Sequence, residues 1–197
     1  MEDLIRRIGL AKVIIDDGMC RVGPHLDAAS AVDQQLVRGA GRAIQLADAV
    51  VALCRQGHAN EALPVLRQLC EMAASLCWLA AALGAGGRAS GARAEDLAQE
   101  WEDSKWSKLW PEERLLRRAR EGGLTEDSHA VLALCRDFVL GGPLTLPWAH
   151  RFGWSRREGL RPRTVLGLAA SIMAHALKAL ELRWPGSFPG AEKIWQR

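Results

Sequence analysis

The chain of 197 residues is 49% hydrophobic and 25% charged, which suits one globular domain with a sizeable core. Its formal net charge of +3 is too small to indicate nucleic-acid binding by itself, so a basic binding surface would have to be local. The first ten residues carry acidic side chains and lack the apolar core of a signal peptide. The longest uncharged stretch, 72–87, is shorter than the ~20 residues of a membrane span. We therefore expect a cytoplasmic protein with no membrane contact.

The first half of the chain has the periodicity of long amphipathic helices. A first helix is expected over residues 2–15, with Gly18 just past its end and a loop over 16–29. Ser30 and Asn60 are the expected N-caps of an antiparallel hairpin of two helices, about 30–56 and 59–84. Their apolar seams recur in steps of three and four: Leu36, Ala40, Ala43, Ala47, Val50 and Cys54, then Ala62, Leu66, Leu69, Ala73, Leu76, Ala80 and Leu83.

The second half continues with shorter helices. A glycine-rich stretch, 84–94, predicts a flexible linker, and a short helix over 94–104 leads to Pro111, which opens the next helix. Further helices are expected over 125–139 and 164–183, separated by an irregular connection over 144–161. No segment alternates as a strand does. The sequence predicts an all-α, single-domain bundle of six or seven helices over residues 1–197, built on the long hairpin.

Cysteine and histidine spacing offers no metal or redox motif. The five cysteines are odd in number and form no C-x-x-C pair, so we interpret Cys54, Cys70 and Cys77 as small buried hydrophobic residues that stay reduced. The histidines show no ligand spacing, and we predict neither a metal nor a cofactor. Ser171 and His175 lie one helical turn apart. A catalytic dyad also needs an orienting carboxylate and an oxyanion hole, for which the sequence has no signal, so we interpret the spacing as coincidence.

Two groups of residues are candidate binding sites. Arg67 and Glu71 share a narrow polar stripe with Gln68 and Ser75 on an otherwise apolar helix. The stripe is either solvated, with a helical ion pair, or lines a pocket or a partner surface. The second group interleaves arginine with aromatic residues over 148–163, and its candidate residues are Arg156, Arg157, Arg161 and Trp154. This composition suits phosphates and bases, and it also suits a solvated loop whose aromatic rings pack onto the bundle.

The turn at residue 57 and the helix after it carry the pattern Gly57, Glu61, Ala62, Leu66, Arg67, Leu69, Glu71, Trp78 and Leu79. This pattern resembles an uncharacterised bacterial all-helical family, a domain of unknown function, over about residues 30–150. The helical layout of that family looks like HEPN domains, many of which are ribonuclease toxins or nucleotide-binding partners. HEPN nucleases use an arginine followed, after four to six residues, by a histidine that acts as acid or base. None of the five histidines has an arginine at that distance upstream, so the resemblance implies a fold without the nuclease activity.

These features favour a non-enzymatic helical module that binds a protein partner or a second copy of itself. Trp101, Trp106 and Trp110 are candidate anchors of such an interface. Two alternatives stay open. One is RNA or nucleotide binding through residues 150–163 by a degenerate HEPN-like ribonuclease. The other is a small-molecule pocket or an unrecognised enzyme around Arg67 and Glu71.

Overall fold

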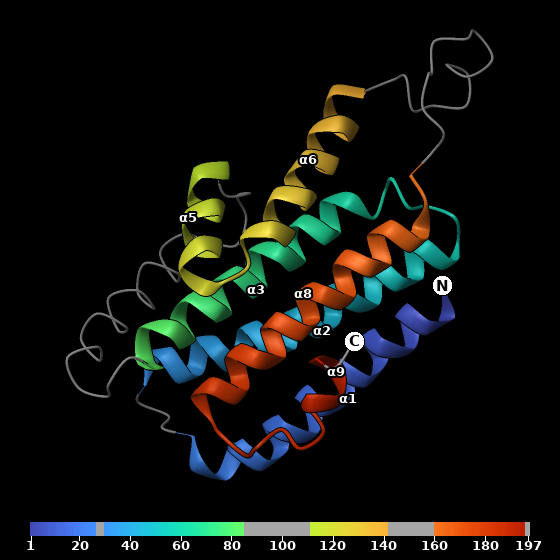
Figure 1. Cartoon of the computed structure of the whole chain (residues 1–197). Helices are drawn as coiled ribbons and strands as arrows, with labels where there is room; N and C mark the ends of the chain where they lie inside the picture. Colours follow the sequence, from blue (N-terminus) through green and yellow to red (C-terminus); the bar gives the residue numbers. More distant parts are fainter. Residues whose placement is uncertain (27–29, 85–110, 142–159, 196–197) are drawn as a thin grey trace, which may run out of the picture.

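The computed structural model of the chain describes residues 1–26, 30–84, 111–141 and 160–195, and these form a helical bundle (Figure 1). The helices are α1 (Glu2–Val22), α2 (Ala31–Arg55), α3 (Leu63–Gly84), α5 (Glu112–Gly122), α6 (Thr125–Gly141), α8 (Pro162–Arg183) and α9 (Glu192–Trp195), with a 3-10 turn, η1, at Gly23–His25. The described residues contain no strand. The all-α fold class is confirmed.

The long hairpin of α2 and α3 is confirmed, and its seams form the inside of the bundle. Twelve seam residues are 0–2% exposed: Leu36, Ala40, Ala43, Ala47, Val50, Cys54, Ala62, Leu66, Leu69, Ala73, Leu76 and Ala80. The turn between the two helices needs Gly57, because its φ of +84° is one that side chains with a Cβ rarely adopt. The amide of His58 closes the turn by donating to the carbonyl of Leu53 at 2.9 Å.

Helix α3 lies at the centre of the bundle, in contact with α2, α5, α6 and α8 (Figure 1). Every residue from Met72 to Ala80 is buried, as expected for a helix that is covered on all sides. Helix α8 also contacts α1 and α2, so it is a second central helix rather than a cover on the hairpin. By length and composition, Leu63–Ala82 and Pro162–Arg183 could each cross a membrane, but 67% and 61% of their apolar windows are buried inside the bundle.

The predicted end of the first helix is wrong. Helix α1 continues to Val22, and Gly18 lies inside it under the ring of Phe188. A Cβ at Gly18 would lie 2.0 Å from Cδ1 of Phe188, so the missing side chain makes room for a packed aromatic ring. The sequence pattern was misleading because glycine ends helices as readily as it permits close packing.

Several boundaries differ from the predicted ones. Ser30 caps α2 by accepting the amide of Asp33 at 3.2 Å, as predicted. Asn60 does not cap α3, which begins at Leu63; its Oδ1 accepts the amide of Leu160 at 3.4 Å and so joins the hairpin turn to the start of α8. Pro111 precedes α5 as its N-cap. Helix α9 was not predicted, while the linker from residue 85, the helix over 94–104 and the connection over 144–159 lie outside the described residues.

Candidate functional surfaces

The predicted pair of Arg67 and Glu71 is present on α3. Nε of Arg67 donates to Oε1 of Glu71 at 3.2 Å, and the two side chains are only 18% and 12% exposed. The pair therefore lies near the contacts of α3 with its neighbours instead of on an open helix face. Charges this far from water are stable because they are paired.

The polar stripe continues into the interface between α3 and α5. Ser75 is buried; its hydroxyl donates to the carbonyl oxygen of Glu71 at 2.9 Å and accepts from Nη1 of Arg118 at 3.4 Å. The fully buried Arg118 guanidinium lies 4.1 Å from the centre of the Trp78 ring, whose Nε1 donates to Glu121 at 2.6 Å. A desolvated cation over an indole ring contributes about 2 kcal/mol, so this contact helps to hold α5 on α3.

Arg118 was missed by the sequence analysis. The helix dipole by itself explains basic residues at the end of α5, so nothing in the sequence called for a separate, buried role of Arg118. The usable signal was its spacing, because Leu115, Arg118 and Ala119 are three and four residues apart and are the buried residues of α5.

A second ion pair joins α5 to α6. Arg136 contacts both carboxylate oxygens of Glu112, with Nε donating to Oε1 at 3.2 Å. The hydrogen bond from Arg136 lowers the pKa of Glu112, and the nearby charge of Arg67 acts in the same direction. The two pairs thus form an alternating set of charges along α3, α5 and α6. The Arg136–Glu112 pair links α6 to α5, whereas the Arg67–Glu71 pair lies within α3.

Ser171 and His175 both contact Asp127, which the sequence analysis did not connect with them. The hydroxyl of Ser171 donates to Oδ2 of Asp127 at 2.8 Å, and Nε2 of His175 lies 3.5 Å from the same oxygen. Burial lowers the pKa of His175, while the charge of Asp127 acts against that shift. A nucleophilic serine would have to donate to the imidazole, whereas here its proton points to the carboxylate. The arrangement ties α6 to α8.

The predicted burial of Cys54, Cys70 and Cys77 is confirmed. Cys54, Cys70, Cys77 and Cys135 are buried and free, and Cys20 is exposed. Burial raises the pKa of Cys54 to about 11 and those of Cys70 and Cys77 to about 12. Thiols that stay protonated in this way are poor nucleophiles and poor metal ligands. Within the described ranges, no three His, Cys, Asp or Glu side chains come together in a way that could hold a metal ion.

The basic and aromatic segment is described only at its end. Arg161 is the exposed N-cap residue of α8. Arg156, Arg157 and Trp154, like Trp101, Trp106 and Trp110, lie outside the described residues. Nucleic-acid contact through residues 150–163 therefore stays a prediction.

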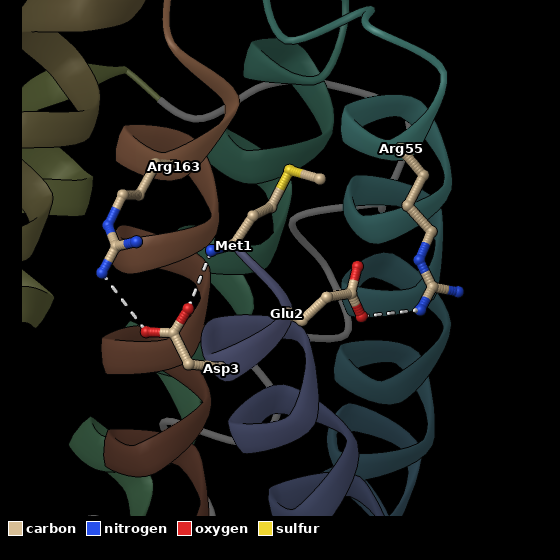
Figure 2. A network of polar contacts seen from close by, with 5 residues as sticks. All are labelled: Met1, Glu2, Asp3, Arg55 and Arg163. Atoms are coloured by element: carbon tan, nitrogen blue, oxygen red, sulfur yellow. Dashed lines mark hydrogen bonds and ion pairs between the residues drawn. The ribbon is translucent and has the colours of Figure 1, made fainter.

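Acidic residues at the start of α1 tie this helix to its two neighbours (Figure 2). Figure 2 shows Glu2 and Asp3 reaching to opposite sides, Glu2 toward Arg55 at 3.7 Å and Asp3 toward Arg163 at 3.3 Å. The amino group of Met1 donates to Asp3 at 2.8 Å, and this bond lowers the pKa of Asp3. The first turn of α1 is thus held between α2 and α8.

The outer face of α1 carries exposed aliphatic side chains. Leu10 and Val13 are 39% and 56% exposed, whereas Ile8, Ala11 and Ile15 on the opposite face are buried in the core. The C-terminal segment borders this face on one side, because Nη2 of Arg7 donates to the carbonyl of Ile194 in α9 at 2.6 Å. On the other side, Lys12 pairs with Asp48 of α2. The surface between these contacts is a second candidate site, which the sequence analysis had not singled out.

Most of the hairpin lies in a segment that matches a family of unknown function. Residues 35–121 match the model of a family described as "Family of unknown function (DUF5677)". This segment begins in α2 and ends in α5, so it includes Arg67, Glu71, Ser75, Trp78 and Arg118. Searches of curated proteins and of solved structures found no match. The HEPN-like layout and a bacterial origin stay predictions. The hairpin and α5 thus match a family of unknown function, which confirms the predicted resemblance to an uncharacterised domain and brings no known activity with it.

Proposed function

We propose that this chain is a non-enzymatic helical-bundle protein that acts by binding a protein partner or a second copy of itself in the cytoplasm. The observation that carries the proposal is the outer face of α1, where Leu10 and Val13 are exposed three residues apart. Full burial of a wholly exposed aliphatic side chain contributes about 1.5–3 kcal/mol, and a partner would gain the share of this that corresponds to the 39% and 56% of Leu10 and Val13 still exposed. Two such side chains on one helix face offer a partner an apolar contact that the bundle itself does not use.

The polar contacts between helices support a structural rather than a catalytic role for these side chains. Ser171 and His175 are both engaged by Asp127, and Arg136 is engaged by Glu112. Each of these contacts joins two different helices. Side chains held in this way contribute to the stability and geometry of the bundle.

The proposal is tested with the full chain by size-exclusion chromatography coupled to light scattering over a range of concentrations. We expect self-association, or binding of one purified partner, that is lost in Val13→Asp. Leu182→Asp is the matched control, because Leu182 is also exposed, at 53%, but lies on α8. Circular dichroism checks that both variants keep the helical fold. A strictly monomeric protein without a specific partner contradicts the proposal, and so does binding that survives Val13→Asp.

A small-molecule site around Arg67 and Glu71 is the second candidate function. The observation that favours it is the low exposure of the pair, since a ligand that reaches it would be shielded from water. Thermal unfolding with ATP and with inorganic phosphate would test the site. If Arg67 binds an anion, the wild-type melting temperature rises with ligand concentration and that of Arg67→Met does not. Equal behaviour of the two proteins excludes an anion site at Arg67.

A further inference from the structure

We propose that the partner of the α1 face is a second copy of this chain, docked with its own α1 antiparallel across a two-fold axis. The inference rests on the proposed function and makes it specific, because it names the partner and the register. It is carried by the order of the exposed residues along α1. Arg6, Leu10, Val13 and Asp17 are spaced by four, three and four residues and are all exposed, so they form one stripe on the outer face.

The stripe is complementary to itself. It has a basic residue at one end, two aliphatic residues in the middle and an acidic residue at the other end. In an antiparallel pair of identical helices, opposing residues have numbers with a constant sum, and for Arg6 with Asp17 and for Leu10 with Val13 that sum is 23. One register therefore satisfies both kinds of contact. The two-fold axis makes each contact twice, which gives two ion pairs around a centre of four aliphatic side chains.

The charged ends of the stripe are available for a partner. Within the part of the chain that the structure describes, neither Arg6 nor Asp17 forms an ion pair, whereas the neighbouring Arg7 and Lys12 are used in contacts with α9 and α2. The same register places the exposed Arg21 opposite Glu2 of the second copy. Glu2 is 70% exposed and contacts Arg55 only at 3.7 Å, so its carboxylate can accept a further donor (Figure 2).

Charge selects the antiparallel arrangement. A parallel pair would place the two Arg6 side chains side by side, and likewise the two Asp17 side chains, and like charges at such short distances are unfavourable. Helix α1 has 21 residues and so is about 31 Å long. A single helix pair of this length covers less than the ~1,600 Å² of a standard interface. We therefore expect a reversible dimer with a dissociation constant on the order of micromolar.

Charge reversal tests the register directly. In Arg6→Glu every opposing pair becomes acidic against acidic, and in Asp17→Arg every pair becomes basic against basic. Each variant alone should dimerise about tenfold more weakly than the wild type in low salt, measured by sedimentation equilibrium. An equimolar mixture of the two variants restores both opposite-charge pairs, so a mixed dimer should form with near wild-type affinity. The double variant Arg6→Glu/Asp17→Arg should also dimerise as the wild type does.

The outcomes separate this inference from the broader proposal. Rescue in the mixture supports the antiparallel register, because a structural defect in either variant would persist on mixing. A wild-type dimer that ignores both reversals, or variants that the mixture does not rescue, overturns the α1 register and leaves a protein-interaction function in place. A wild-type monomer that binds a different protein also overturns the inference. A monomer with no partner at all overturns both.

Discussion

The substitution Gly18→Ala is a direct test of the packing between α1 and the C-terminal segment. The added Cβ would lie 2.0 Å from a ring atom of Phe188, against the ~3.5–4 Å of an ordinary carbon contact, so the ring has to leave its place. Phe188 is 1% exposed, and losing its packing costs about 3–5 kcal/mol. The gain in helix propensity of alanine over glycine offsets about 1 kcal/mol. The net expectation is a loss of about 2–4 kcal/mol, or roughly 4–16 °C in melting temperature for a chain of this size.

Urea unfolding at equilibrium measures this loss, at a protein concentration low enough to keep the chain monomeric. Gly41→Ala is the matched control, because a Cβ on this exposed glycine of α2 meets nothing within 4 Å and should stabilise the helix by up to about 1 kcal/mol. In the double variant Gly18→Ala/Phe188→Ala the two losses should not add, since both remove the same contact. The packing argument would be refuted if Gly18→Ala stabilised the protein as much as Gly41→Ala does. It would also be refuted if the loss of unfolding free energy in Gly18→Ala/Phe188→Ala equalled the sum of the two single losses.

Three further outcomes are expected. With iodoacetamide at about pH 8, the native protein should take up one label rapidly, at Cys20. The other four thiols are buried, and burial raises the pKa of Cys77, for example, to about 12. Mass spectrometry that shows several rapidly added labels would contradict this expectation. The pKa of His175 is lowered from 6.5 by burial, so its neutral form stabilises the fold fully above pH 6.5, and this contribution is lost as the pH falls through the lowered value. The unfolding free energy of His175→Gln should therefore fall less steeply than that of the wild type between about pH 7 and pH 5, and identical slopes would exclude the effect. Gly122→Ala should cost about 1–3 kcal/mol by overpacking, since its Cβ would lie 2.6 Å from Cβ of Cys77; unchanged unfolding in urea would show that α5 can shift without cost.

The hairpin could be predicted from the sequence because its signal is repeated. Each seam of α2 and α3 provides six or more apolar residues at the helical period, and every described member is 0–2% exposed. The Arg67–Glu71 pair was predictable for a similar reason, since residues four apart on a helix are neighbours in any fold. A single residue predicted the structure less reliably than a repeated pattern did. A glycine at position 18 could end a helix or admit a ring, and the choice depended on Phe188, 170 residues away in the sequence.

The sequence could not predict which residues meet at the candidate sites, because these residues lie on different helices. Asp127 meets Ser171 and His175 only because α6 packs beside α8, and Arg118 meets Trp78 only because α5 lies on α3. The exposed stripe on α1 is an intermediate case. Its spacing is visible in the sequence, but Leu10 and Val13 could have faced another helix until the structure placed α2, α8 and α9 around the rest of α1.

The sequence by itself determined the helical class, the two seams and the burial of the hairpin, because the period of apolar residues follows from the geometry of a single helix. Only the tertiary structure decided that α3 and α8 share the centre, that an arginine is buried against a tryptophan and that Leu10 and Val13 of α1 are exposed. These features depend on which helix faces meet. That choice is a property of the whole packed core, to which residues far apart in the chain contribute together.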